Sequence, residues 1–315
     1  MRYYEIIAGE TKWTTWVNGQ TDPGALQVEL DMPLSAFDAP ISNLSVRVWG
    51  VSLQTISSAS DFNGKPISIA VGMKPGLPLA TAAPPAGVVF QGSILQAFGN
   101  WVQTEQYLEF VVTTNLNVTD ANNIVLDGKK GQSLEDAVKQ ALTSCAPALT
   151  VDIKIDPRLI LVADDPATFP DLFSFANHVK NLSQTIIGGD YPGVSIFLDS
   201  TAFKVFDGSA DTNPKSINFY DMIGQPTWYG PAQMQFNCVM RADLTVGDII
   251  KMPDGLYVLT AAAQTQALRY KSAFNGTFRI NALRHVGNSR QPNAESWITS
   301  YFCSPTSTNP VFANG

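Results

Sequence analysis

The chain has 315 residues, of which 45% are hydrophobic and only 15% are charged, and its formal net charge is −7. One hydrophobic core stops growing near ~250–300 residues, so this length predicts two or three domains. The acidic balance argues against a protein held on nucleic acid by phosphate contacts, because such proteins carry basic stripes. The low charge indicates a surface that is covered by uncharged polar residues or buried against partner molecules.

Cysteine usage and the first residues indicate a protein made and folded in the cytoplasm. Cys145, Cys238 and Cys303 lie far apart, match no metal-binding spacing and are odd in number, so we expect free thiols. The segment Met1–Glu5 is typical of a strand rather than of a signal peptide. The sequence has no run of ~18 apolar residues, so we expect no membrane span.

The first part of the chain, residues 1–115, predicts strands that are separated by turns. Apolar and polar residues alternate in each run, as in a strand with one buried face. The Pro- and Ala-rich segment 76–87 predicts a protruding loop. Short strands at this spacing are typical of an antiparallel barrel or sandwich. The predicted strands are residues 25–32, 44–49, 65–73, 88–98 and 106–113.

The middle of the chain, residues 116–212, predicts a small α+β module. Apolar residues at helical spacing predict a helix over 133–145, capped by Ser133, and a second helix over 168–182, capped by Thr168. Alternating runs predict strands at residues 149–155, 194–198 and 202–206.

After residue 213 the β pattern returns. We expect strands over 233–240, 256–262 and 277–285, and a tight turn at Gly247-Asp248. The remaining residues, 288–315, are polar with embedded aromatic residues and predict an extension that is disordered or docked on another subunit. The sequence therefore predicts two β segments, 1–115 and 213–287, flanking the insert.

The candidate catalytic groups all have a structural interpretation that we prefer. His178 falls within a predicted helix and His285 at the end of a predicted strand, and neither has the spacing of a metal motif. A Ser-His-Asp triad can assemble from distant residues, but the sequence has no G-x-S-x-G motif. The pairs Glu135-Asp136 and Asp164-Asp165 lie at predicted helix starts, where carboxylates favour the helix dipole.

Two glycine-containing segments and six tryptophans are further candidate site residues. Gly128–Gly131 carries two lysines but lacks phosphate-loop spacing, and no strong strand precedes it, so it predicts a turn, as does Gly188-Gly189. Tryptophans scattered along a sequence are typical of carbohydrate-stacking sites, of protein interfaces or of hydrophobic cores. We favour an interface or core position for most of them. They are Trp13, Trp16, Trp49, Trp101, Trp228 and Trp297. We therefore assign no catalytic, cofactor-binding or metal-binding residue and expect no cofactor and no enzymatic activity.

The order of these features resembles the tail hub, or baseplate hub, proteins of tailed bacteriophages. Hub proteins have a strand followed by "G-x-x-I-x-I" and "x-F-x-G-x-I" phrases, later a "G-x-P" phrase, and then an "L-x-V-G-D-x-I" turn. Two helix–strand units lie between these parts in the hubs as in this chain. The matching segments here are residues 41–50, 64–69, 89–94, 222–226, 234–240 and 241–250.

The resemblance implies a mainly β fold with an α+β insert, in which two tube-forming antiparallel β-barrel domains flank the helix-strand module. Its domains would be residues 1–115, 116–212 and 213–287, with an extension at 288–315. It also implies a homotrimer whose pseudo-sixfold ring joins the hexameric tail tube to a central spike or tip. Such a ring sits in the virion tail with other baseplate proteins, is assembled in the host cytoplasm, and lets DNA pass without sequence-specific binding.

Two other classes stay open at this stage. One is another β-rich tail component, such as a distal-tail or tube-completion protein or a part of a contractile injection system. The other is a tail-associated cell-wall hydrolase, which would need a deep cleft with paired carboxylates or a zinc site.

Overall fold

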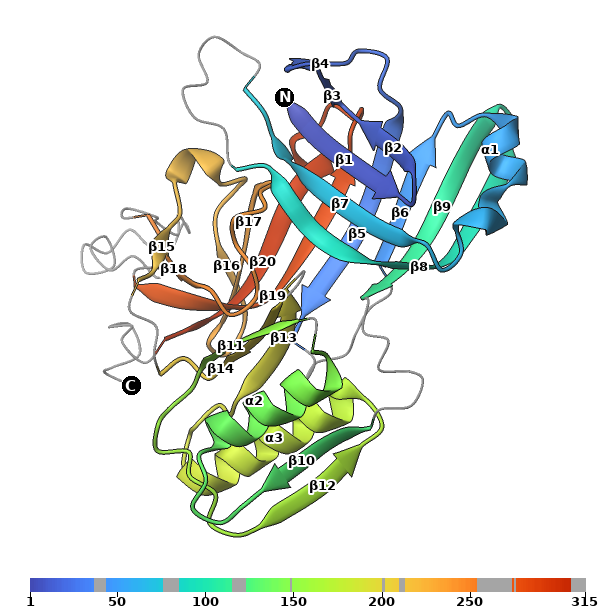
Figure 1. Ribbon diagram of the computed structural model, residues 1–315. Helices are drawn as coiled ribbons and strands as arrows, with labels where there is room; N and C mark the ends of the chain where they lie inside the picture. Colours follow the sequence, from blue (N-terminus) through green and yellow to red (C-terminus); the bar gives the residue numbers. More distant parts are fainter. Residues whose placement is uncertain are drawn as a thin grey trace, which may run out of the picture. The chain divides into compact units, whose positions relative to one another are not determined.

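The computed structural model describes most of the chain, in two compact units. The described residues are 1–36, 44–75, 85–114, 123–147, 149–199, 202–209, 213–253, 274 and 276–306. The first unit combines Met1–Leu34, Ser42–Asn115 and Pro214–Gly315, and the second combines Ser35–Ile41 with Leu116–Asn213. The first unit is built around one large, mainly antiparallel sheet and the second carries two longer helices (Figure 1). The expected mainly β fold with an α+β insert is confirmed.

The N-terminal part of the β unit follows the predicted alternation closely. In the strand that begins at Gln27, the side chains of Val28, Leu30 and Met32 are buried while their neighbours are half-exposed. The strands run in the spatial order β5-β6-β9-β8-β7-β1-β2. The elements are β1 Arg2–Ala8, β2 Thr11–Thr14, β3 Trp16–Val17, β4 Gln20–Thr21, β5 Gln27–Ser35, β6 Leu44–Trp49, α1 Leu53–Ser57, η1 Ala59–Phe62, β7 Pro66–Met73, β8 Gly87–Val102 and β9 Glu105–Thr114.

The C-terminal part of the β unit forms a second set of strands in the order β16-β17-β20-β19, with β18 pairing β19 and β15 pairing β18. The predicted strand over 256–262 and most of the predicted loop over 76–87 lie outside the described residues. The elements are β15 Lys215–Ser216, η2 Phe219–Asp221, β16 Thr227–Gly230, β17 Gln233–Val239, β18 Ile249–Lys251, β19 Thr277–Asn288, η3 Ala294–Ser296 and β20 Trp297–Pro305.

These two sets of strands repeat one arrangement. In chain order, β1, β5, β6, β7, β8 and β9 correspond to β15, β16, β17, β18, β19 and β20, and the order across the sheet is then the same in both sets. Every shared neighbour pair is antiparallel in both sets except the last, because β1 pairs β7 antiparallel while the two-residue β15 pairs β18 parallel.

The correspondence extends to individual residues. The amide of Gly64 donates to Ile94 O (2.7 Å), and the amide of Gly247 donates to Ile280 O (2.8 Å). Both glycines have positive φ, 76° and 91°, which a residue with a side chain adopts only with strain. Directly after Ile94 and after Ile280, the pairing register of the long strand shifts by one residue, as at a β-bulge. These features define the register in which the two sets correspond.

The segment that was expected to be a C-terminal extension contains a central strand. β20 lies between β17 and β19, and Trp297 and Tyr301 are among its fully buried residues. The indole of Trp297 donates to Gly72 O (2.9 Å), which links β20 to β7. Residues 297–305 are therefore part of the sheet. The domain boundaries inferred from the sequence stay a prediction.

The α+β unit packs two helices against short strands. Ser133 caps α2 as predicted, accepting the Asp136 amide at 3.0 Å. The predicted start of the second helix at Thr168 is wrong, because Thr168 lies in β12 and pairs with β10, and Asp171 caps α3 instead. The elements are β10 Ile124–Gly128, α2 Leu134–Cys145, β11 Thr150–Lys154, β12 Asp165–Phe169, α3 Leu172–Ile187, β13 Ser195–Asp199 and β14 Ala202–Phe206.

Candidate functional site

The two histidines have separate and different surroundings. His178 lies on α3, and its Nε2 is 2.7 Å from Oδ2 of Asp165 while its ring contacts Phe169. His285 lies in β19, fully buried, with Nδ1 2.8 Å from Oγ1 of Thr299. Burial lowers the pKa of His285 to about 3, so this ring is neutral at neutral pH.

The carboxylate pairs serve local structure. Asp164 accepts the backbone amide of Lys130 at 2.8 Å, and Asp136 accepts the hydroxyl of Ser133 at 2.7 Å. The segment Gly128–Gly131 is a turn, as predicted, but it directly follows strand β10, which the sequence interpretation did not expect. The structure brings none of these candidates into a shared pocket among the described pockets.

The described part of the chain contains neither a cluster of metal ligands nor a membrane-spanning helix. No group of three or more His, Cys, Asp or Glu side chains there could hold a metal ion. No described helix is long and apolar enough to cross a membrane. Cys238 and Cys303 are buried free thiols, and Cys145 is a half-buried one.

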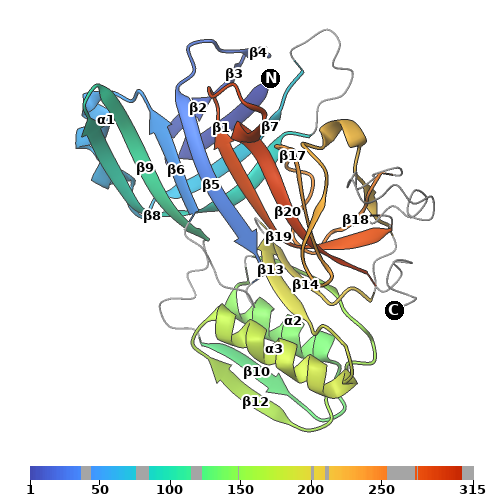
Figure 2. The same cartoon turned by 180° about the vertical axis from the view of Figure 1, so that it is seen from behind.

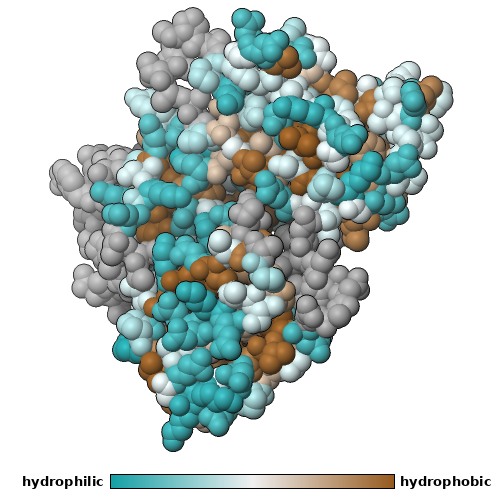
Figure 3. All heavy atoms as spheres, viewed as in Figure 1, coloured by the Kyte–Doolittle hydropathy of each residue, from teal (hydrophilic) through white to brown (hydrophobic). Residues whose placement is uncertain are grey.

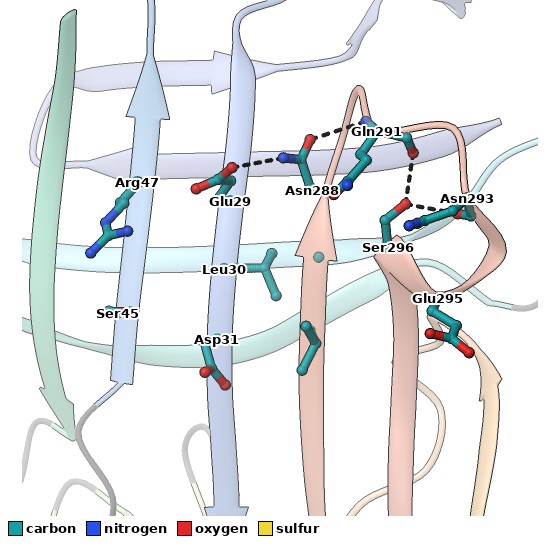
Figure 4. Close-up of a pocket in the computed structure, with 12 residues that line it drawn as sticks. Glu29, Leu30, Asp31, Ser45, Arg47, Asn288, Gln291, Asn293, Glu295 and Ser296 are labelled. Carbon is teal, nitrogen blue, oxygen red and sulfur yellow. Dashed lines mark hydrogen bonds between the residues drawn. The ribbon is translucent and has the colours of Figure 1, made fainter. Parts of the chain in front are cut away.

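The main described hollow is an open polar groove of about 510 Å³ in the β unit. Figure 4 shows its lining, in which strands β5 and β6 supply one side and β19 with the following turn supplies the other. Asn288 donates to Glu29 (2.7 Å), and its side-chain oxygen accepts the Gln291 amide (3.1 Å). The hydroxyl of Ser296 donates to the carbonyls of Gln291 and Asn293.

Two charged residues of this groove, Asp31 and Arg47, are paired within the chain. Arg284 holds Asp31 through two hydrogen bonds, one of them 2.6 Å long, and Arg47 donates to Glu109 at 2.8 Å. The guanidinium of Arg2, in β1, donates to three backbone carbonyls of the segment 288–293 at the end of β19. The groove is therefore the seam where the two strand sets join, and its polar groups fasten that seam.

A second cluster of charges is buried in the β unit. The guanidinium of Arg241 makes two 2.6 Å hydrogen bonds to Asp243 and one of 3.2 Å to Asp221. Only 7% of the Arg241 side chain is exposed. Burial raises the pKa of Asp221, whereas its neighbour Arg241 lowers that pKa. This cluster fixes η2 against the turn that follows β17.

A third cluster lies in the α+β unit around the buried carboxylate of Asp207. Its Oδ2 accepts the hydroxyl of Tyr191 (2.5 Å) and the amide of Asp156 (2.7 Å). Burial and the neighbouring carboxylate raise the pKa of Tyr191. Asp156 in turn holds Arg158 through its side chain, which lowers the pKa of Asp156. These contacts tie the ends of β11 and β14 together.

One tryptophan is buried, one is exposed and the other four are half-buried. Trp13 packs on Phe62 and Phe110, and Trp297 is buried. Trp101, near the end of β8, is 61% exposed. Leu95, Phe98 and Val102 of the same strand are exposed too, so this part of β8 presents a set of apolar side chains to solvent. Figure 3 shows hydrophobic residues in patches between hydrophilic ones on the face that it draws.

Comparisons with known proteins identify the fold. No family model matches the sequence, and no curated protein matches it. A 43 kDa tail protein of prophage MuSo2 from Shewanella oneidensis is similar over 97% of both chains, with a TM-score of 0.55 at 7% identity. A tail protein from Neisseria meningitidis is similar over 97% of both chains, with a TM-score of 0.50 at 10% identity.

A third similar structure is the Escherichia coli protein c3393, a component of the type VI secretion system. Its TM-score is 0.51 at 11% identity, over 90% of this chain and 74% of that protein. It exhibits structural similarity to the T4 bacteriophage tail proteins gp27 and gp5. The chain thus has the fold of phage tail and related secretion-system proteins. The resemblance inferred from the sequence is confirmed at the level of the fold.

Proposed function

We propose that this protein is a structural subunit of a tail or baseplate hub. Three copies form a ring that joins a hexameric tail tube to a central spike or tip and lets DNA pass through its lumen. The observation that carries this proposal is the repeated strand arrangement, since each chain supplies two copies of one β framework. Three such chains present six similar frameworks, which suits a sixfold partner on one side and a threefold partner on the other.

The net charge and the side-chain contacts favour a subunit that neither binds DNA tightly nor catalyses a reaction. A net charge of −7 repels phosphates, so DNA in a lumen would not adhere. The candidate catalytic groups bind neighbouring backbone and side-chain atoms. The proposed partners are two further copies, the tube protein, the spike or tip and other baseplate proteins. The protein would act in the virion tail after assembly in the host cytoplasm, without enzymatic activity.

The similarity to a type VI secretion component supports one alternative, a part of a contractile injection system or another β-rich tail ring. The native mass of the purified chain distinguishes these proposals. A trimer of the 34.1-kDa chain is the expected result. A hexamer would favour a distal-tail or tube-completion ring instead. A monomer at every concentration and in the presence of tail partners would contradict both proposals.

A further inference from the structure

The seam between the two strand sets is a junction of β5 with β19. These strands are neighbours in the sheet, as Figure 2 also shows. The amide of Ser289 donates to Val28 O (2.8 Å), and Arg284 pairs with Asp31. Only the far half of β19 takes part, because its first residues, Thr277–Arg279, pair with β18.

The repeat implies a second junction of the same kind, which the described residues do not fill. β8 corresponds to β19, and β16 corresponds to β5. Just as β19 pairs with β18 only along its first residues, β8 pairs with β7 only along its first half, Gly87–Ser93. β16 pairs with β17 alone and is an edge strand of the described sheet. The described part of the chain therefore contains one complete junction, β5 with β19, and the two separate halves of another.

The corresponding side chains of the two junctions differ in chemistry rather than in exposure, since Arg284 and Asp31 of the complete junction are 50% and 44% exposed. Counted from the shared bulge, Phe98 of β8 occupies the position that Arg284 occupies in β19. Counted through the pairing with β17, Thr227 of β16 occupies the position that Asp31 occupies in β5. Phe98 is 41% exposed, and Thr227 and its neighbour Tyr229 are exposed. Trp101, also exposed, lies further along β8. The ion pair of the complete junction thus corresponds to an aromatic ring and a hydroxyl in the open one.

The open junction differs from the complete one in its backbone. The insert containing α1 and η1 packs along β8, where the Asn63 side chain already accepts the Ala97 amide at 2.8 Å. On the other half, Pro226 stands at the position of Leu30 and has no amide hydrogen to donate. Backbone pairing across the open junction is limited for both reasons, so packing of apolar side chains must provide most of its contact.

We propose that the far half of β8, with its exposed Leu95, Phe98, Trp101 and Val102, docks against the β16 edge of a second copy of this chain. The internal junction is the template, because it shows which surfaces of the two frameworks meet side by side. The contact is head-to-tail, so it closes into a ring when the rotation between copies permits. This inference rests on the proposed ring function and names the surfaces by which the copies meet.

Photo-cross-linking tests this interface in the full-length protein. Phe98 is replaced by p-benzoylphenylalanine, unlabelled and heavy-isotope-labelled chains are mixed, and the adducts are mapped by mass spectrometry after irradiation. The expected adducts join Phe98 of one chain to the segment Thr227–Gly230 of another. The matched control carries the same probe at Val125, which is 56% exposed in the α+β unit, and is expected to give no adduct to that segment.

A second variant pair measures the loss of assembly directly. Phe98→Asp is expected to convert the oligomer to monomer without changing the unfolding transition, whereas Val125→Asp leaves the oligomer intact. An oligomer whose adducts fall elsewhere, or that survives Phe98→Asp, would overturn this interface and leave the ring proposal standing. A wild-type chain that stays monomeric at every concentration and in the presence of tail partners would overturn both.

Discussion

At the scale of single residues, the stability of the β unit depends on a few buried polar side chains that form hydrogen bonds within the chain. The six tryptophans of the sequence all lie in the β unit and none lies in the α+β unit, so tryptophan fluorescence follows the β unit alone. The effect of a substitution in the β unit can therefore be measured separately from unfolding of the α+β unit. The sequence predicted that the candidate catalytic groups are structural, but it did not indicate which of them are buried.

Arg241 is expected to be far more important for stability than Arg284, although each holds an aspartate through two hydrogen bonds. Arg241→Met leaves two carboxylates without their buried partner, and such a loss costs about 3–5 kcal/mol. Arg284→Met is the matched control, since its side chain is 50% exposed and an exposed pair contributes about 0–1 kcal/mol. Urea unfolding followed by tryptophan fluorescence checks the difference, and equal losses would contradict the assignment.

His285 is expected to make the β unit sensitive to acid. Its pKa is about 3 in the folded protein and 6.5 as the ordinary value, so the unfolded chain binds more protons between these pH values. Stability therefore falls as the pH falls from about 6.5 to about 3, by at most ~1.4 kcal/mol per pH unit from this residue. His285→Asn keeps a hydrogen-bonding nitrogen near Thr299 and should flatten that slope. An unchanged slope would count against a neutral buried ring.

At the scale of elements, strands whose apolar and polar residues alternate in the sequence were predictable, whereas β10, β12 and β20 were not. Val28, Leu30 and Met32 alternate with polar residues because one face of β5 meets the core. β20 shows no alternation because its residues Trp297–Tyr301 are buried on both faces, so its sequence does not carry the period of a surface strand. β10 has one buried face, but its exposed Val125 interrupts the alternation of apolar and polar residues, and β12 contains Pro166.

The corrected start of α3 gives a prediction at this scale. Asp171 accepts the Ser174 amide at 2.7 Å as the helix cap, whereas Thr168 is an exposed residue of β12. Asp171→Ala is expected to destabilise the helical unit by about 1 kcal/mol, and Thr168→Ala by clearly less. Thermal melting monitored at the helix band of circular dichroism reports on this unit, because α2 and α3 are the two long helices of the described chain. A larger effect at Thr168 would restore the original prediction.

At the scale of the whole molecule, the sequence indicated two β segments around an insert, and the structure adds their shared strand order. That order could not be read from the sequence, since equivalent positions carry different residues, as Phe98 and Arg284 do. What the two strand sets share is hydrogen-bond geometry at Gly64 and Gly247 rather than side chains. The same comparison points to the open junction between β8 and β16, which are not paired within the described residues.

An electron cryo-microscopy reconstruction of the assembled ring tests the central claim most directly. The account predicts three chains whose six β frameworks surround a lumen, with β5–β19 junctions inside chains alternating with β8–β16 junctions between them. A ring of six chains, or a particle in which the two frameworks of a chain do not occupy equivalent places around one axis, would contradict it.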